Sequence, residues 1–193
     1  MTKSYIDSKD TTLFEKAVAA ELFQERRTFE ECRFRQCSFA GGKIDGMVFR
    51  SCIFEECDLT LATFRDTSLQ EVRFIRCKLV GVQFDACRKL LLQVAFEKCL
   101  SRLSGYAGMQ LKNTVFDGSD LQEADFTGAD LSGSSFAGCD LTRALFNRTN
   151  LEGADFRSAF GYAFAPESNR LKRAKFSMPE VLGLLDGHGI EIE

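Results

Sequence analysis

Cysteine is the residue type whose number and spacing first invite a chemical interpretation. The chain has eight cysteines but one histidine, which excludes a zinc site built on two histidines. The smallest spacing between cysteines is five residues and not three, so the spacing of zinc-binding Cys-x2-Cys motifs is absent. We expect buried free thiols that act as small hydrophobic side chains, which suits a reducing cytoplasm. The cysteines are Cys32, Cys37, Cys52, Cys57, Cys77, Cys87, Cys99 and Cys139.

Aspartates are the second group with chemical potential. Each of five directly precedes a large apolar residue, and we expect all five to point outward. They are Asp120, Asp125, Asp130, Asp140 and Asp155. The sequence brings no two of them into an evident cleft, so a paired-carboxylate enzyme is not expected. We therefore predict a protein without catalytic activity, metal or cofactor.

A period of five residues governs the positions of the cysteines and aspartates alike. Large apolar residues occupy every fifth position from Phe29 to Phe84, and again from Tyr106 to Phe156. The residue two before each of them is nearly always small, and six of the eight cysteines occupy such a position. The other two, Cys87 and Cys99, stand two before Lys89 and Ser101, which replace large residues of the repeat. Self-similarity of this kind is typical of a stacked repeat architecture.

Geometry decides which repeat this is. On an α-helix, side chains five residues apart would spiral around every face, and on a flat strand they would alternate between faces. A short extended piece followed by a turn brings each large residue inward, and repeated turning in one sense builds a hollow β-solenoid. Between Leu111 and Phe156 the large residues alternate between Leu and Phe, which an even number of units per coil would stack like upon like. Four units, or 20 residues, would give a square coil.

Segments such as Ala124-Asp125-Phe126-Thr127-Gly128 and Ala129-Asp130-Leu131-Ser132-Gly133 resemble the A(D/N)LXX motif of pentapeptide-repeat proteins. The resemblance covers about residues 29–88 and 104–160. It implies an all-β solenoid, a right-handed quadrilateral β-helix with a C-terminal capping helix. We expect an N-terminal cap over 1–28, the β-helix over 29–160 with a register break near 85–105, and a C-terminal cap over 161–193.

The register break comes from two extra residues between Phe84 and Phe96. Lys89 occupies a position where a large apolar residue belongs, and Ser101 does the same further on. One interpretation is a bulge that only shifts the register. The other is a projecting loop that contacts a partner, with Arg88, Lys89, Leu91 and Leu92 as its candidate residues.

The two ends of a solenoid expose its core and need caps. At the C-terminus, Ser177 to Glu180 has the pattern of a capping box with Pro179 in the first helical turn, and Gly187 and Gly189 would end the helix. This ending is similar to the terminal module of Qnr-type quinolone-resistance and albicidin- or microcin-immunity proteins, in which the module joins two chains. We expect a homodimer through Val181, Leu182, Leu185, Ile190 and Ile192, of which the last two alternate with Glu191 and Glu193 like a short strand. At the N-terminus, residues 12–20 fit a helical or a β cap equally well.

Charge and hydropathy exclude several classes of function. A net charge of −3 offers no basic field for nucleic acid, and no apolar stretch is long enough to span a membrane. Residues 106–160 carry four basic and eight acidic side chains, a mildly anionic half. The resemblance implies a DNA mimic that binds DNA gyrase or topoisomerase IV and protects it from inhibitors. The candidate contact residues on the rod are Asp120, Asp125, Asp130, Asp140 and Asp155, whose outward charges would imitate a phosphate backbone. The alternative is a structural or adaptor rod that binds another protein.

Overall fold

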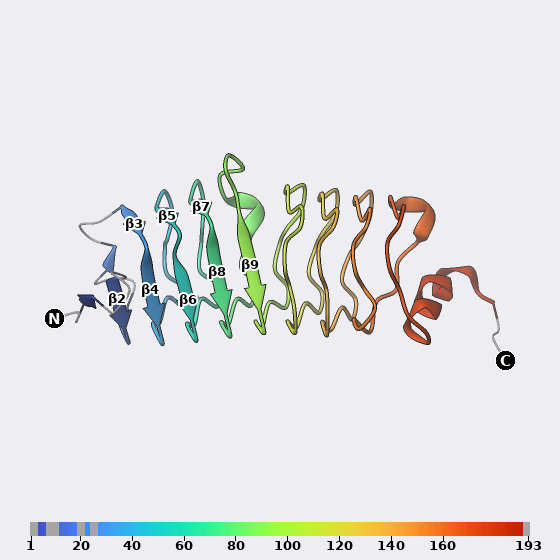
Figure 1. Cartoon of the computed structure of the whole chain (residues 1–193), viewed down its shortest axis with the longest axis horizontal. Helices are drawn as coiled ribbons and strands as arrows, with labels where there is room; N and C mark the ends of the chain where they lie inside the picture. The colour runs from blue at the N-terminus through green and yellow to red at the C-terminus, as the bar shows by residue number, and fades with distance from the viewer. Residues whose placement is uncertain (1–3, 7–11, 19–21, 24–26, 191–193) are drawn as a thin grey trace.

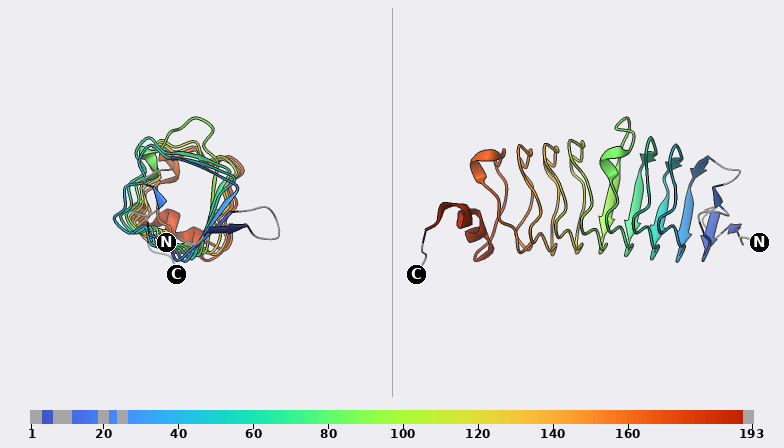
Figure 2. Two further views of the ribbon diagram at one scale, coloured as in Figure 1. Left: turned by 90° about the vertical axis from the view of Figure 1, so that its left-hand side faces the viewer. Right: turned by 180° about the vertical axis from the view of Figure 1, so that it is seen from behind.

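The chain coils into a straight rod, with its two termini at opposite ends (Figure 1). The structure, a computed structural model, describes residues 4–6, 12–18, 22–23 and 27–190. Viewed along the rod, successive coils overlie one another in a four-sided outline (Figure 2). The predicted quadrilateral β-solenoid is therefore confirmed.

Two parallel sheets form the N-terminal half of the rod. The larger sheet has the strand order β1-β2-β4-β6-β8-β9 and the smaller one β3-β5-β7. The strands of the larger sheet are β1 (Ser4–Ile6), β2 (Thr12–Glu15), β4 (Cys32–Arg35), β6 (Ile53–Glu55), β8 (Val72–Ile75) and β9 (Val94–Glu97). Those of the smaller sheet are β3 (Thr28–Glu30), β5 (Val48–Arg50) and β7 (Ser68–Gln70). In both sheets consecutive coils are paired in parallel, except that β1 is antiparallel to β2.

Register follows the predicted coil of 20 residues. Phe34 pairs with Phe54 in the N-terminal half, and Asp130 pairs with Asn150 in the C-terminal half, where single bridges replace strands. Parallel pairing begins at β2 and continues to the bridge between Asp155 and Lys175. It thus extends beyond residues 29–160 at both ends. The stretch 12–15, for which the sequence left helix and strand open, is a strand.

The core is a set of stacked side-chain columns, because each coil places the same repeat position above the last. One column consists of nine phenylalanines whose adjacent ring centroids lie 4.7–5.4 Å apart. They are Phe14, Phe34, Phe54, Phe74, Phe96, Phe116, Phe136, Phe156 and Phe176. This spacing matches the distance between hydrogen-bonded strands, so backbone pairing and ring stacking reinforce each other.

A buried polar network interrupts the apolar columns at one level. Ser101 occupies an inward position where the coils before and after it carry Leu79 and Leu121. Its hydroxyl lies 2.8 Å from the hydroxyl of Tyr106 and donates to Ser104, which in turn donates to the carbonyl of Leu79. The small Ser101 thus leaves room for the extra oxygen of Tyr106 and also satisfies it.

Left-handed backbone at the corners turns the chain from one face to the next. Glycines occupy many of these corners, such as Gly128 at φ +68°, but many other residues adopt the same conformation. Among the non-glycine residues there, the apolar ones are Leu61, Leu91 and Leu103, and all three are exposed. A left-handed leucine is conformationally unfavourable, and nothing in the fold explains these three.

Short 3₁₀ helices complete the chain: η1 (Phe84–Ala86), η2 (Pro166–Ser168) and η3 (Glu180–His188). The predicted C-terminal helix is present as η3, and Gly189 ends it in the left-handed conformation at φ +61°. The predicted capping box is wrong. The hydroxyl of Ser177 donates to the carbonyl of Arg157 in the last coils, and Pro179 precedes the helix and does not lie in its first turn. Ile190 has no assigned secondary structure, and the other residues of the predicted strand, 191–193, lie outside the described residues.

Candidate functional site

A two-residue insertion makes one coil project beyond the others. Val72 pairs with Val94 and Gln83 with Gly105, an offset of 22 residues where other coils show 20. The extra length follows η1 and forms a loop that rises above the neighbouring coils (Figure 1). Of the two interpretations left open by the sequence, the structure therefore shows a projecting loop. Leu90 and Leu91 are 78% and 68% exposed in it.

The predicted contact residues of the loop have different surroundings. The guanidinium of Arg88 donates to both carboxylate oxygens of Asp66 at 2.6 and 2.8 Å, and this pair lowers the pKa of Asp66. Lys89 is exposed and its Nζ donates to the carbonyl of Gly108 at 3.3 Å. Leu91 is exposed as predicted, but Leu92 is not, because it packs against the core at the base of the loop. The exposed anchor that the sequence analysis missed is Leu90, the first leucine of the run.

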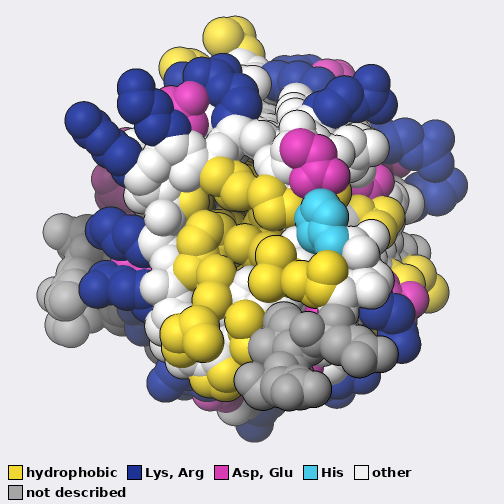
Figure 3. Space-filling model, turned by 90° about the vertical axis from the view of Figure 1, so that its right-hand side faces the viewer, with side chains coloured by type: hydrophobic (Ala, Val, Ile, Leu, Met, Phe, Trp, Pro, Cys, Tyr) yellow, Lys and Arg dark blue, Asp and Glu magenta, His cyan; other side chains and the backbone are white. Residues whose placement is uncertain are grey.

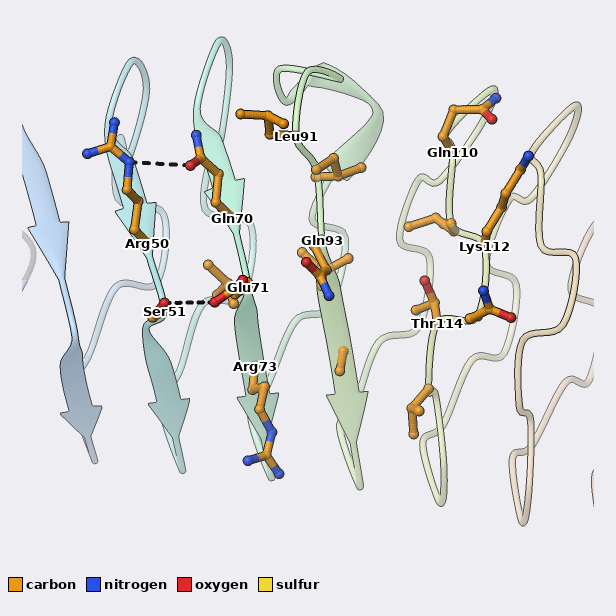
Figure 4. A pocket seen from close by; sticks show the side chains of 17 residues that line it. Arg50, Ser51, Gln70, Glu71, Arg73, Leu91, Gln93, Gln110, Lys112 and Thr114 are labelled. Atoms are coloured by element: carbon orange, nitrogen blue, oxygen red, sulfur yellow. Dashed lines mark hydrogen bonds between the residues drawn. The ribbon is translucent and has the colours of Figure 1, made fainter. Parts of the chain in front are cut away.

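A groove of about 760 Å³ lies on the face beside this loop. Its lining includes Arg50, Gln70 and Arg73 on one side, Gln93 in the middle, and Gln110 and Lys112 on the other side (Figure 4). Two hydrogen bonds fix the first side: Arg50 donates to Gln70 at 3.3 Å, and Ser51 donates to Glu71 at 2.9 Å. The groove is open, and its lining combines charged and amide side chains with apolar ones, so it suits an extended chain more than an apolar small molecule.

The five predicted aspartates all make the same local hydrogen bond. In each, one carboxylate oxygen accepts from the amide two residues later, at 2.8–3.3 Å. This is the geometry of an Asx-turn, which holds the corner of the coil. The signal was present in the sequence, because each aspartate stands at the same position of its repeat.

The structure brings together only two of these aspartates. Asp120 and Asp140 stack in adjacent coils, as their parallel bridge shows. Since each repeat advances the chain by one face, Asp125, Asp130 and Asp155 lie on three other faces. Arg102 contacts Asp120 at 2.6 Å, Lys112 contacts Asp130 at 3.4 Å, and Arg157 contacts Asp155 at 2.6 Å. The five therefore form no single acidic surface.

Hydrogen bonding lowers the pKa of two of these carboxylates, Asp140 and Asp155. Burial alone would raise the pKa of Asp140, but bonds from the hydroxyl and amide of Thr142 and from Gln122 outweigh it and lower the pKa. For Asp155 the largest cause is the hydrogen bond from Arg157, which also lowers its pKa. These carboxylates are charged at neutral pH and engaged in local structure.

The C-terminal end of the rod presents an apolar surface (Figure 3). Within η3, Leu184 is buried and Val181, Leu182 and Leu185 are half-buried, whereas Ile190 beyond the helix is 54% exposed. The helix packs closely on the last coil: a Cβ on Gly183 would lie 2.2 Å from the carbonyl oxygen of Tyr162. The carboxylate of Glu180 also accepts from the amide of Gly161 at 3.3 Å. Ile192, the fifth residue of the predicted interface, lies outside the described residues.

Family models match most of the coiled region. A pentapeptide repeat region is matched over residues 48–126, and a model of eight pentapeptide-repeat copies is matched over residues 28–66 and 124–160. The chain belongs to the pentapeptide-repeat family. No curated protein matches it. Membership of the pentapeptide-repeat family agrees with the fold and leaves the partner open.

Solved structures of other pentapeptide-repeat proteins share this architecture. A trypsin-treated form of QnrB1, a plasmid-mediated fluoroquinolone resistance protein, is similar with a TM-score of 0.64 and 18% identity, over 93% of this chain and 99% of that one. A second trypsin-treated form of QnrB1 gives 0.50 and 18%, over 94% and 97%. HetL from Nostoc sp. strain PCC 7120, involved in heterocyst differentiation regulation, gives 0.31 and 15%, over 86% and 84%. At 18% identity, the two QnrB1 matches show a common fold alone.

The cysteines occupy the small inward position of the pentapeptide repeat. All eight are buried. In six of them the thiol donates to a carbonyl of the preceding coil, for example from Cys57 to Phe34 at 3.2 Å and from Cys139 to Phe116 at 2.9 Å. Burial raises the pKa of Cys87 and of Cys139 to about 12. Such thiols are poor nucleophiles and act as packing groups. Among the described residues, no group of three potential ligands is placed to hold a metal ion.

Proposed function

We propose that this pentapeptide-repeat protein is a non-enzymatic binding protein that engages a type II topoisomerase, DNA gyrase or topoisomerase IV, and protects it from inhibitors. The observation that supports the proposal most is the rod itself. Nine stacked rings at 4.7–5.4 Å make an inflexible core. At one strand spacing of ~4.8 Å per coil, the column is about 40 Å long. QnrB1, described as a fluoroquinolone resistance protein, has a similar rod.

Two surfaces would make the contact. The first is the projecting loop, where Leu90 and Leu91 expose apolar side chains on a base fixed by Arg88 and Asp66. The second is the face with Asp120 and Asp140, the pair of turn carboxylates that stack in adjacent coils. A rigid carbon core with regularly spaced carboxylates can imitate a phosphate backbone without any base code. The loop would supply the specificity that charge alone lacks.

Residues 106–160 are still mildly anionic, but three of the five predicted aspartates are paired with cations. This pairing is the observation that favours the alternative function, an adaptor rod that binds a different protein. In that case the loop would be the principal contact and the anionic half would serve solubility.

A gyrase assay with two matched variants separates these functions. Purified protein is added to gyrase-mediated supercoiling and to fluoroquinolone-dependent DNA cleavage. We expect the wild-type protein to lower cleavage and restore supercoiling. Removal of Leu90 and Leu91, which returns the coil to 20 residues, should abolish protection with little change in thermal stability. Leu145→Ala is the control, because Leu145 is 55% exposed and lies away from the loop.

The charge contribution is tested with asparagine, which keeps the Asx-turn. The double variant Asp120→Asn, Asp140→Asn should bind gyrase more weakly, and its binding should depend less on salt concentration. Asp155→Asn, on another face, should change neither property. If the wild-type protein does not bind gyrase at low salt, or does not change inhibitor-dependent cleavage, the topoisomerase function is contradicted and the adaptor function is favoured.

A homodimer joined through the C-terminal ends would double the length of the rod. We propose this arrangement because no part of the chain that the structure describes covers the apolar end surface. We further place the protein in the cytoplasm, where its eight thiols would stay reduced. No helix in the described part of the chain has the length and apolarity to cross a membrane.

A further inference from the structure

The groove beside the loop interrupts the backbone ladder of one face. On this face Val48 pairs with Ser68, and further along Gln110 pairs with Asp130. Between these pairs lies the inserted coil, and in the described residues no bridge joins it to Gln110. The inserted coil is instead hydrogen-bonded to the preceding coil, where the amide of Gln93 donates to the carbonyl of Leu69 at 3.0 Å.

The side of Gln110–Lys112 that faces the inserted coil is therefore a free strand edge. In the equivalent position one coil later, the amide of Asp130 donates to Met109 and its carbonyl accepts from Leu111 at 2.8–2.9 Å. Within the part of the chain that the structure describes, the amide and carbonyl of Gln110 find no backbone partner on the side of the inserted coil. One coil later, the carbonyl of Ser132 accepts a hydrogen bond from the amide of Asn113 at 2.9 Å, but the carbonyl of Lys112 has no equivalent donor among the described residues.

These three groups have the pattern that an added strand requires. The donor and the acceptor of Gln110, together with the acceptor of Lys112, recur with the two-residue period of a β-edge. Both residues line the 760 Å³ groove, so the edge faces open space (Figure 4). An unpaired edge is a template for pairing with another chain unless it is covered.

The charge of the groove indicates which chain it would accept. Arg50, Arg73 and Lys112 line it against the single carboxylate of Glu71. The three cations pair with carboxylates that do not line the groove: Arg50 with Glu30, Arg73 with Glu97, and Lys112 with Asp130 at 3.4 Å. Amide side chains of Gln70, Gln93 and Gln110 add further polar partners. An acidic segment would find more complementary groups here than a basic one.

We propose that the Gln110–Lys112 edge binds an extended, acidic segment of a partner protein as an additional β-strand. The segment would run along the groove, donate amides to the carbonyls of Gln110 and Lys112, and accept from the amide of Gln110. Its acidic side chains would face Arg73 and Lys112, and Leu91 would border it at the loop. The inference does not depend on the identity of the partner as a topoisomerase.

Selection from a random library of twelve-residue peptides tests the inference on the full-length protein. We expect enriched sequences that are rich in Asp and Glu, and synthetic peptides of these sequences should bind with a Kd that calorimetry can measure. Lys112→Glu should weaken their binding at least tenfold. Lys172→Glu is the matched control, because Lys172 is exposed at the same repeat position of the same face three coils further on. It should leave the Kd unchanged.

Two further measurements address the backbone. Gln110→Pro removes an amide that has no acceptor among the described residues, so the fold should persist while peptide binding falls at least tenfold. If Gln110→Pro does not fold, amide exchange of the wild-type protein decides: the Gln110 amide should exchange quickly alone and at least tenfold more slowly with peptide. The inference would be overturned if no peptide is enriched or if the enriched peptides are basic. It would also be overturned if Lys112→Glu does not change the Kd and the peptide does not slow exchange of the Gln110 amide.

Discussion

At the scale of single residues, the stacked rings carry the stability of the rod. Phe126 is fully buried, with Tyr106 at 4.9 Å on one side and Phe146 at 5.1 Å on the other, measured between ring centroids. Phe126→Ala should lower the free energy of unfolding by about 3–5 kcal/mol, because the narrow core cannot close the cavity. Arg143→Ala, which removes an exposed partner of Glu123, should cost less than ~0.5 kcal/mol. Urea titrations measure both, and equal losses would contradict the column model.

Ser101 and Tyr106 should behave as one unit. Ser101→Leu places a bulky side chain against the phenol oxygen, and Tyr106→Phe leaves the Ser101 hydroxyl without its 2.8 Å partner. Each single change should cost ~1–3 kcal/mol, whereas the double variant reproduces the Leu and Phe pairing of neighbouring coils and should recover much of that loss. A double-mutant cycle in urea gives the coupling energy. Additive losses would show that the two side chains do not depend on each other.

The thiols offer a test of burial that needs no mutation. All eight should react slowly with a thiol reagent in the native protein and completely after denaturation. Cys37 should be the first to react among them, because a hydrogen bond with Cys57 lowers its pKa. Mass spectrometry of partly labelled protein identifies the modified sites. Rapid native labelling of several cysteines would contradict their inward position.

At the scale of elements, the turn aspartate Asp140 makes the stability of a coil corner depend on pH. The pKa of Asp140 is lowered in the folded state, so its stabilising contribution is present above about pH 4 and is lost as the pH falls through the folded pKa. Asp140→Asn should retain the turn, as Asn150 does by accepting from Glu152, but should not titrate. The stability gap between wild type and variant should therefore narrow from pH 6 to pH 3. Thermal melts across this range measure it, and a constant gap would contradict a titrating contribution.

At the scale of the whole molecule, the apolar C-terminal end decides the assembly. A chain cut before Ser177 loses η3 and uncovers Phe164 and Phe176 in the last coils. The full-length protein should sediment as a dimer at micromolar concentration, and the truncated chain should give monomers or aggregates, since the shared surface is gone. Leu182→Glu, which keeps the chain length, should give monomers of nearly normal melting temperature. A full-length monomer would refute the dimer.

The sequence by itself determined the coil. Large Phe and Leu residues recur every five positions, with a small residue two positions earlier, and only a solenoid buries all of them. The solenoid, the burial of the cysteines and the inserted coil near Phe84 could therefore be predicted. These features depend on local repetition, which a sequence displays directly. The capping box failed for the opposite reason: Ser177 has a better partner in the carbonyl of Arg157, which is 20 residues away in sequence and adjacent only in the coil.

The tertiary structure alone decided how the surfaces are composed. Five aspartates that look equivalent in sequence fall on four faces, because each repeat turns the chain by a quarter of the coil. Leu92 turns inward while Leu90 and Leu91 turn outward, since the backbone returns to Leu69 at Gln93. The free edge at Gln110 has no counterpart in the sequence pattern at all. It exists because the inserted coil leaves the face, and the unpaired groups belong to a segment whose own repeat is regular.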